Sequence, residues 1–186
     1  MQVILIAVIS LDGRLTLPGQ PGPGFASAED QAWFHRVLQE FDCAVMGRAT
    51  YETAREEILA SPRRGFLRTV ATRTPGRFAH DLRPGVVEFT ADTPDRVVQD
   101  LARRGFGRCA LLGGGQIYRE YLDAGLVDAL WLTLEPVVLG GGTPLADGGP
   151  VRDGRFKLGE MRLLGPDTLL LNYQKPGRPL LPLPFD

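Results

Sequence analysis

The sequence predicts an α/β fold in which a mixed, mostly parallel sheet carries helices on both faces and ends in an antiparallel hairpin. Short apolar runs alternate with amphipathic helical patterns along most of the chain, as in successive strand–helix units. The last two strand-like segments alternate in hydrophobicity around a turn at Gly165-Pro166-Asp167. Three earlier strands end at Gly13, Gly47 and Gly113. Because parallel strands gather their carboxyl ends at one edge, we expect these glycines to meet where such sheets bind ligands.

The composition is that of an ordinary globular chain. With 186 residues, 44% of them hydrophobic and 23% charged, one domain with a substantial core is the simplest organisation. The formal net charge of -1 provides no strongly charged surface for nucleic acid or for a membrane, so neither partner is expected. We divide the chain into a single domain over 1–175 and a Pro-rich tail over 176–186.

The cysteines and the first residues indicate a cytoplasmic protein without a metal. Cys43 and Cys109 both lie in apolar runs, which is typical of reduced core residues. Only His35 and His80 could join them as soft ligands, so no metal-ligand cluster is expected. The opening MQVILIAVISLDG lacks a basic start and a cleavage site, which favours a first strand over a signal peptide. No segment is long enough to span a bilayer.

The first half of the chain begins with a strand at Val3–Leu11, a continuous apolar run that is turned by Asp12-Gly13. The Gly- and Pro-rich stretch Thr16–Phe25 is predicted as an irregular loop. A helix over Ser27–Phe41 follows, with apolar residues at helical spacing. The other elements expected here are strands at Ala44–Met46, Phe66–Thr72 and Val86–Thr90, a helix at Thr50–Leu59 and a basic turn at Pro62–Gly65.

The second half contains the stretch that organises the chain. A strand at Cys109–Leu112 runs through three glycines into a helix that closes near Gly125. Free N–H groups at such a helix start suit an anion such as a pyrophosphate, although the glycines are equally compatible with a tight, closely packed turn. The remaining elements expected are a helix at Pro94–Arg104, a strand at Val127–Leu134, a loop at Pro136–Gly142, the hairpin Phe156–Leu164 with Thr168–Gln174, and an extended tail from Pro176.

Four separated segments, in order and covering most of residues 1–140, resemble the dihydrofolate-reductase superfold. They are LIAVISLDGRL (Leu5–Leu15), DQAWFHR (Asp30–Arg36), VMGRATYET (Val45–Thr53) and LLGGGQIYREYL (Leu111–Leu122). The second is similar to the acid-bearing helix of dihydrofolate reductase, and the third and fourth are similar to the cofactor motifs of the fold. The resemblance therefore implies a dihydrofolate-reductase-like α/β fold.

Within this superfold, two segments are typical of the reductase domain of riboflavin biosynthesis and of stand-alone proteins similar to it. They are SLDGRL (Ser10–Leu15) and GLVDALWLTLEPVVLGGGTPL (Gly125–Leu145). The Pro-Trp that usually precedes the acid helix of dihydrofolate reductases is absent, and so is the zinc pattern of the partner deaminase domain. The chain departs from the riboflavin domain at Leu112, where that domain often has a glutamate.

The resemblance implies an NADPH-dependent pyrimidine reductase that acts on a small phosphorylated pyrimidine substrate, and a homodimer. Hydride would pass to the ribosyl carbon and give the ribityl product. Two alternatives stay open. One is dihydrofolate reductase, with a pterin substrate. The other is a non-catalytic NADPH-binding protein of the same fold.

For the cofactor, the resemblance implies that Arg48 meets the 2′-phosphate of NADPH and that Thr50 takes the pyrophosphate; otherwise Arg48 is a surface residue and Thr50 caps a helix. Thr72 and Arg73 match the segment at the adenosine phosphate end, or form an exposed loop. Gly113-Gly114 matches a position where the fold often holds a cis peptide. The full set implied is Ala7, Gly47, Arg48, Ala49, Thr50, Thr72, Arg73, Gly113, Gly114, Gly115, Gln116, Ile117 and Tyr118.

For the substrate, the resemblance makes Asp30 the catalytic acid. Ser27-x-x-Asp30 is also a capping-box pattern, and the two roles are compatible. Asp12 either shapes the loop over the substrate or makes an Asp-Gly turn, and the arginines Arg63, Arg64 and Arg68 either bind a substrate phosphate or form a solvated loop. The substrate-binding set implied is Val8, Asp12, Phe34, Thr133, Arg64 and Arg68.

Overall fold

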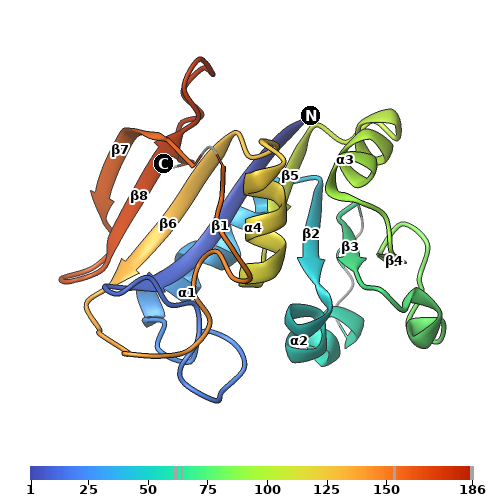
Figure 1. Ribbon diagram of the computed structural model, residues 1–186, viewed down its shortest axis with the longest axis horizontal. Helices are drawn as coiled ribbons and strands as arrows, with labels where there is room; N and C mark the ends of the chain where they lie inside the picture. The colour runs from blue at the N-terminus through green and yellow to red at the C-terminus, as the bar shows by residue number, and fades with distance from the viewer. Residues whose placement is uncertain (61–62, 64, 153, 185–186) are drawn as a thin grey trace.

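The computed structural model describes residues 1–60, 63, 65–152 and 154–184 (Figure 1). The strands are β1 (Gln2–Ser10), β2 (Cys43–Gly47), β3 (Leu67–Ala71), β4 (Val87–Thr90), β5 (Arg108–Leu111), β6 (Ala129–Glu135), β7 (Lys157–Leu163) and β8 (Leu169–Gln174). The helices are α1 (Ala28–Val37), α2 (Arg48–Ala60), α3 (Pro94–Arg103) and α4 (Gly115–Asp123), with 3-10 turns at Leu38–Glu40 and Pro75–Phe78. Each predicted strand and helix is present.

The strands form one sheet in the order β4-β3-β2-β5-β1-β6-β8-β7. The strands from β1 to β6 pair in parallel, whereas β8 pairs antiparallel with β6 and with β7. The predicted mixed sheet with a terminal hairpin is therefore confirmed. The carboxyl ends of the parallel strands point toward the lower edge in Figure 1, where α2 and two long loops lie.

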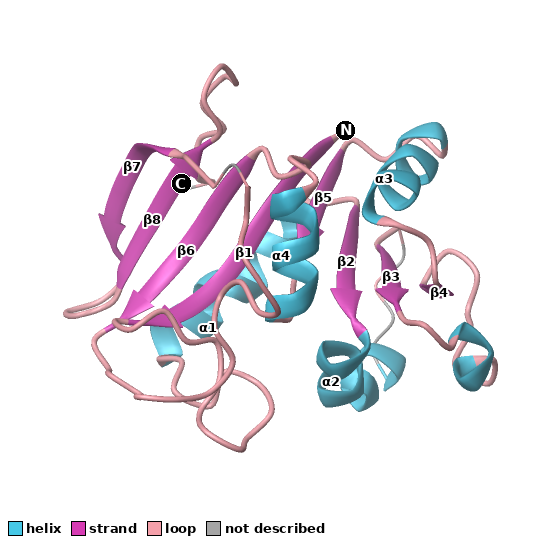
Figure 2. Ribbon diagram, in the orientation of Figure 1, coloured by secondary structure: helices cyan, strands magenta, loops and turns pink. Residues whose placement is uncertain are grey.

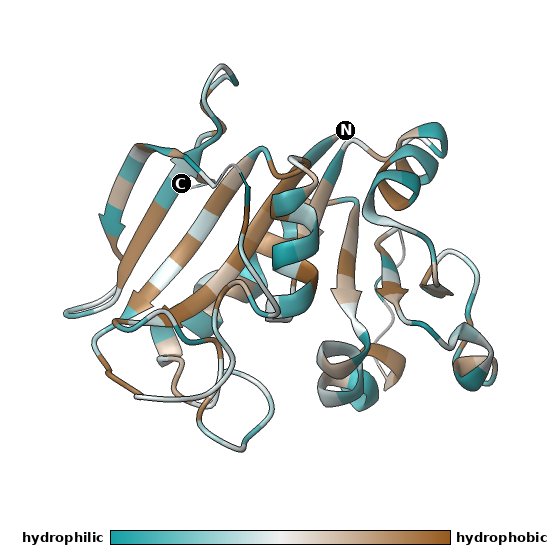
Figure 3. Ribbon diagram, viewed as in Figure 1, coloured by the Kyte–Doolittle hydropathy of each residue, from teal (hydrophilic) through white to brown (hydrophobic). Residues whose placement is uncertain are grey.

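Helices cover both faces of the sheet, because the central strands carry apolar residues on both faces. In β1, Val3 and Leu5 pack with residues of α3 and α4, whereas Ile4 and Ile6 pack with residues of α1 on the other face. A strand covered on both faces reads as a continuous apolar run, as β1 does. In Figure 3 the central strands are mostly hydrophobic, whereas the outer side of α3 is hydrophilic.

Helix α1 is shorter than its apolar periodicity predicts. It ends at Val37, and the chain continues as a 3-10 turn to Glu40. Arg63 explains the early end, because its guanidinium donates to the carbonyl oxygens of Leu38 at 2.6 Å and Gln39 at 3.1 Å. A continued α-helix would provide backbone N–H donors to these carbonyl oxygens. Here Arg63 provides donors from outside the helix. Of the predicted basic turn at Pro62–Gly65, only Arg63 and Gly65 belong to the described residues.

The loops that follow β1 and β6 are joined into one unit (Figure 2). The Asp12 carboxylate accepts the backbone N–H groups of Leu139 at 3.0 Å and Gly140 at 2.9 Å. Farther along, the N–H of Leu145 donates to the carbonyl of Gly13 at 3.1 Å. These bonds hold both loops together over the carboxyl edge of the sheet.

The tail from Pro176 is extended, as predicted, and it packs on the domain. Leu181 and Leu183 are buried in the cluster on the α1 side of the sheet. The side-chain amide of Asn172 donates to the carbonyl of Leu181 at 2.8 Å, which anchors the tail to β8. Within the described ranges, no helix has the length and apolarity that crossing a bilayer requires.

Candidate functional site

The paired glycines after β5 bring two strand ends into close contact. The N–H of Gly47 donates to the carbonyl of Gly113 at 2.6 Å. A Cβ on Gly47 would lie 2.9 Å from Ile117 Cγ1, and a Cβ on Gly113 would lie 2.9 Å from the Tyr118 ring. Gly113 also has a φ of +94°, and its peptide bond to Gly114 is cis. Close packing therefore requires glycine at Gly47 and Gly113.

Helix α4 begins directly behind these glycines and is fixed at its start. The Tyr118 hydroxyl donates to the carbonyl of Ile6 at 2.6 Å, and burial raises the pKa of this phenol. Gly115 lies beneath the loop after β6, where a Cβ would collide with the carbonyl of Pro144. Gly114 remains half-buried, with Thr50 of α2 as its side-chain neighbour. Gly114 thus lies beside Thr50, near the start of α2.

Helix α2 begins at Arg48, directly after β2. Thr50 is therefore the third residue of the helix, and the alternative that it caps the helix is wrong. The Arg48 side chain is 48% exposed and pairs with Glu52 at 2.8 Å. Neither α2 nor α4 has an acidic residue in its first turn, so both helix starts can accept an anion.

Thr72 and Arg73 follow the neighbouring strand β3. The register pairs Gly47 with Ala71, so Arg48 and Thr72 are the next residues on adjacent strands. The N–H of Thr72 donates to the carbonyl of Thr90 at 2.8 Å, which fixes this segment, while the Arg73 side chain is exposed. Two arginines, Arg48 and Arg73, thus come from neighbouring strand ends. The donor set of this edge fits a dinucleotide with an additional phosphate.

The predicted acid is buried on the α1 side of the same edge. Asp30 is 6% exposed, and its carboxyl accepts a hydrogen bond from the hydroxyl of Thr133 in β6. The backbone N–H of Asp30 donates to Ser27 Oγ at 3.1 Å, so Ser27 caps α1. The capping box is closed by a different acid, because Glu135 Oε1 accepts the N–H of Ser27 at 2.9 Å. The Asp30 carboxyl is thereby left for Thr133.

Glu135 is a buried acid that sequence reasoning missed. It is 3% exposed at the end of β6, two residues after Thr133 and on the same face of the strand. Burial raises the pKa of Asp30, the Thr133 hydrogen bond opposes this rise, and the negative charge of Glu135 adds to it. The signal in the sequence was LTLEP, an acid at strand spacing from the threonine.

Apolar residues of α1 and of the neighbouring strand ends accompany the acid at this edge. Val8 pairs with Thr133 across the sheet, and Phe34 follows Asp30 by one helical turn. Both are half-buried. Leu112, at the end of β5, packs against both the α1 cluster and the α2 cluster. The carbonyl of Ala7 lies 3.4 Å from the Thr133 hydroxyl. The structure thus brings together Asp30, Thr133, Val8, Phe34 and Ala7.

Of the predicted substrate arginines, Arg63 and Arg68 do not lie at this edge. Arg68 lies near the start of β3, 4.8 Å from the Phe66 ring centroid, and burial lowers the pKa of its guanidinium. Arg63 contacts the same ring and holds the end of α1. Arg64 lies outside the described residues. Proximity in sequence suggested one phosphate-binding patch, but the end of α1 and the Phe66 ring engage Arg63 and Arg68.

Asp12 makes the predicted turn and also anchors the loop after β6. Its bonds to the amides of Leu139 and Gly140 and to the Ser10 hydroxyl lower its pKa to about 2. Arg14 lies nearby, with its Nε 3.6 Å from an Asp12 carboxylate oxygen. The carboxylate of Asp12 is therefore engaged in joining the two loops.

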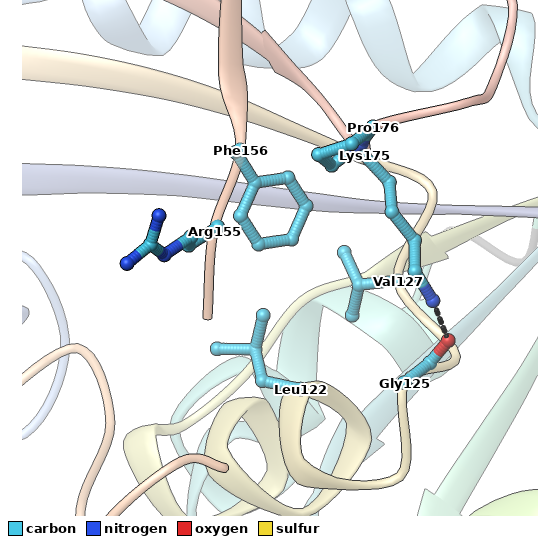
Figure 4. A pocket seen from close by; sticks show the side chains of 7 residues that line it. All are labelled: Leu122, Gly125, Val127, Arg155, Phe156, Lys175 and Pro176. Carbon is cyan, nitrogen blue, oxygen red and sulfur yellow. Dashed lines mark hydrogen bonds between the residues drawn. The ribbon is translucent and has the colours of Figure 1, made fainter. Parts of the chain in front are cut away.

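A small hollow of about 80 Å³ lies elsewhere (Figure 4). The Lys175 ammonium donates to the carbonyl of Gly125 beside it. The hollow adjoins the last turn of α4 and the start of β6, the ends of these elements opposite to the glycine pair and Thr133. We therefore do not assign it to the candidate site. Its lining residues are Leu122, Gly125, Val127, Arg155, Phe156, Lys175 and Pro176.

Comparison with known proteins identifies the class to which this fold and site belong. The family model of the RibD C-terminal domain matches residues 1–170. The chain therefore belongs to the RibD C-terminal domain family, a reductase domain with the dihydrofolate-reductase-like fold, as its four motifs predicted. No curated protein matches the sequence.

Solved structures share the fold at low sequence identity. A pyrimidine reductase-like protein from Corynebacterium diphtheriae has a TM-score of 0.71 and 21% identity, with 93% of this chain and 91% of that chain covered. RibD from Acinetobacter baumannii has a TM-score of 0.74 and 16% identity, with 93% and 57% covered. The deaminase/reductase from Thermotoga maritima has a TM-score of 0.72 and 14% identity, with 93% and 56% covered. The chain thus spans little more than half of these two longer relatives.

Proposed function

We propose that this protein is an NADPH-dependent reductase of a phosphorylated ribosylaminopyrimidine, of the 5-amino-6-(5-phosphoribosylamino)uracil type named for the Thermotoga relative. One observation carries the proposal: the glycine pair that suits a dinucleotide and the buried Asp30 lie at the same edge of one sheet. Such an edge can hold a cofactor and a substrate side by side. NADPH, when bound, supplies the hydride that reduces the ribosyl carbon.

The cofactor phosphates are assigned to the α2 side of the edge. The exposed pair between Arg48 and Glu52 belongs to a class that contributes only about 0–1 kcal/mol, so a phosphate can replace the glutamate. The planar Arg48 fork then binds the 2′-phosphate, with Arg73 as a second positive charge. The half-buried Gly114 and the neighbouring Thr50 border the pyrophosphate, which lies near the starts of α2 and α4.

Asp30 is assigned the proton that accompanies the hydride. Reduction of the open-chain ribosylimine adds hydride to carbon and a proton to nitrogen, which gives the ribityl amine. A buried carboxyl with a raised pKa keeps its proton at higher pH than an exposed one, which suits a general acid. Val8, Phe34 and Leu112 exclude water around it and provide an apolar bed for a flat ring.

Dihydrofolate is the second candidate substrate. The pair formed by Asp30 and Thr133 is suited to hold the ring nitrogens of a pterin as well as a pyrimidine. Leu112 also stands where the riboflavin domain often has a glutamate, and this departure keeps dihydrofolate open as a substrate. Antifolates at low concentration would block dihydrofolate turnover and leave pyrimidine turnover intact.

A homodimer is proposed through the hairpin of β7 and β8. Strand β7 is at the edge of the sheet, and Leu158, Met161 and Leu163 are 55%, 58% and 65% exposed. An edge strand with several exposed apolar side chains is a surface that a second copy can cover.

The proposed function is tested by following NADPH oxidation by the purified protein. The pyrimidine phosphate and dihydrofolate are supplied in parallel, with NADH as a second cofactor. Oxidation of NADPH with the pyrimidine alone is the expected result. Turnover of dihydrofolate alone would replace the first candidate by the second, and tryptophan quenching by NADPH without any turnover would support a binding protein.

A further inference from the structure

Glu135 is held in the interior by two hydrogen bonds. Its Oε1 accepts the backbone N–H of Ser27 at 2.9 Å, and its Oε2 accepts the hydroxyl of Thr168 at 2.8 Å. Thr168 is itself buried, just before β8. One carboxylate at the end of β6 thus joins the start of α1 to the start of β8.

These contacts continue to Asp30. Ser27 Oγ accepts the N–H of Asp30 at 3.1 Å and lies 3.2 Å from Thr168 Oγ1. Glu135 and Ser27 therefore determine where the first turn of α1 sits on the sheet. The position of that turn in turn directs the Asp30 carboxyl to Thr133.

Glu135 and Asp30 are two buried acids for which the described residues provide no counter-ion. Among the described residues, no ion pair includes either carboxyl. Two carboxylates that share a buried space resist being charged together. Both carboxyl oxygens of Glu135 accept hydrogen bonds from fixed donors, the N–H of Ser27 and the hydroxyl of Thr168, whereas the donor to Asp30 is the hydroxyl of Thr133, which can rotate.

The Thr133 hydroxyl can form a hydrogen bond with Asp30 whether the carboxyl is ionised or protonated. Its hydroxyl lies within reach of both the Asp30 carboxyl and the carbonyl of Ala7. When Asp30 is ionised, the hydroxyl donates to it. When Asp30 is protonated, its O–H donates to Thr133 Oγ1, and the threonine turns its own proton to Ala7. Asp30 is thus the member of the pair that can exchange its proton without breaking the network.

We propose that Glu135 is a positioning residue for Asp30: it fixes the first turn of α1 through Ser27 and Thr168, and so holds the Asp30 carboxyl where it can give its proton to substrate. The proposal rests on the proposed function in that Asp30 delivers this proton to substrate. Thr133 and Glu135 of β6 face Asp30, and the Thr133 hydroxyl also lies within reach of the carbonyl of Ala7 in β1. Among them, Glu135 is the titratable group.

The test compares wild-type protein with Glu135→Gln. The amide oxygen still accepts from Ser27 and the amide nitrogen can donate to Thr168, so the substitution removes the charge and keeps the contacts. The carboxyl signal of Asp30, assigned by its loss in Asp30→Asn, is titrated by NMR without substrate. We expect its midpoint to fall by roughly one pH unit in Glu135→Gln, and the alkaline limb of kcat to move with it.

Two variants complete the test. Glu29→Gln removes an exposed charge from the same helical turn. The titration midpoint of Asp30 in this variant should equal that of wild type. Thr168→Val withdraws one donor from Glu135, so the midpoint should fall in the same direction by a smaller amount. An unchanged midpoint in both Glu135→Gln and Thr168→Val overturns the proposal, and so does an equal fall in Glu29→Gln. The NMR midpoint needs no turnover, so an inactive protein with a shifted midpoint refutes the proposed function and not the role of Glu135.

Discussion

The hydroxyl of Thr133 donates a hydrogen bond to the carboxyl of Asp30 across a sequence separation of 103 residues. This contact joins the first turn of α1 to the middle of β6 and places a polar pair between two apolar layers. A buried polar pair is stable only when its members have hydrogen-bond partners, and here the Thr133 hydroxyl bonds to the Asp30 carboxyl and also lies 3.4 Å from the carbonyl of Ala7. The acid of the proposed reaction is thus built into the packing of the fold.

Replacement of Asp30 by Asn should separate catalysis from capping. The backbone N–H that bonds to Ser27 is unchanged, so the melting temperature should stay close to that of wild type. Loss of the acid should lower kcat by about 100-fold or more. Steady-state kinetics and thermal melts measure the two effects, and full turnover by a stable Asp30→Asn protein would show that the acid role is wrong.

The raised pKa of Asp30 should appear in the stability of the protein. Its folded pKa lies above the unfolded value, so its contribution is fully present below the unfolded pKa and is lost as the pH rises through the folded pKa. The free energy of unfolding should therefore decline less steeply with rising pH in Asp30→Asn than in wild type. Denaturant titrations from about pH 4 upward measure this difference, and parallel curves would contradict the raised pKa.

Arg48→Ala should weaken NADPH binding by about 10- to 100-fold, because charge-assisted bonds to the 2′-phosphate contribute about 1.5–3 kcal/mol. NADH lacks that phosphate, so its affinity should not change. Tryptophan fluorescence titrations with both nucleotides provide the measurement. Arg103→Ala, at an exposed position on α3, is the matched control and should bind both nucleotides as wild type does. Equal losses for NADPH and NADH would remove Arg48 from the 2′-phosphate site.

Gly113→Ala should both destabilise the fold and abolish nucleotide binding. The added Cβ would meet the Tyr118 ring at 2.9 Å, and the φ of +94° is unfavourable for alanine. Gly85→Ala is the control, since its φ of +75° is similar but no atom lies within 4 Å of the added Cβ. The free energy of unfolding of the control should fall only by the cost of a left-handed backbone conformation for alanine, about 1–2 kcal/mol. Equal unfolding free energies for the two variants would contradict the close packing at Gly113.

Leu163→Asp should convert the proposed dimer into a monomer. Leu163 is the most exposed of the three large apolar residues on β7, so a charge there should hardly affect the folded monomer. Light scattering coupled to size-exclusion chromatography gives the mass of each variant. Leu82→Asp, at an exposed leucine away from the hairpin, should keep the dimer. A monomeric wild-type protein would end this proposal.

Local pattern was sufficient to predict the strands of the sheet and the tight glycine turn after β5. Continuous apolar runs such as β1 and the alternating hairpin specify strands through burial alone. The end of α1 could not be predicted, because it depends on Arg63 reaching the carbonyl of Leu38 from 25 residues away. The apolar periodicity continues to Phe41, but Arg63, which lies between α2 and β3, donates to the carbonyl oxygens after Val37.

The acid network shows a similar limit. The pattern Ser27-x-x-Asp30 predicts that Asp30 closes its own capping box, whereas the partner is Glu135, 108 residues away. That exchange depends on how α1 packs against β6, which no local spacing encodes. Arg68 was grouped with Arg64 by their closeness in sequence, but the position of Arg68 near the start of β3 separates it from the carboxyl edge.

Transfer of deuterium from NADPH to the substrate tests the central claim most directly. The purified protein is incubated with the pyrimidine phosphate and with NADPH that carries deuterium at the hydride-donating position of the nicotinamide, and the product is examined by mass spectrometry. We predict a ribityl product that contains one deuterium at the former ribosyl carbon, and little product from Asp30→Asn. Unlabelled substrate recovered intact, while the same protein transfers deuterium to dihydrofolate, would contradict the account.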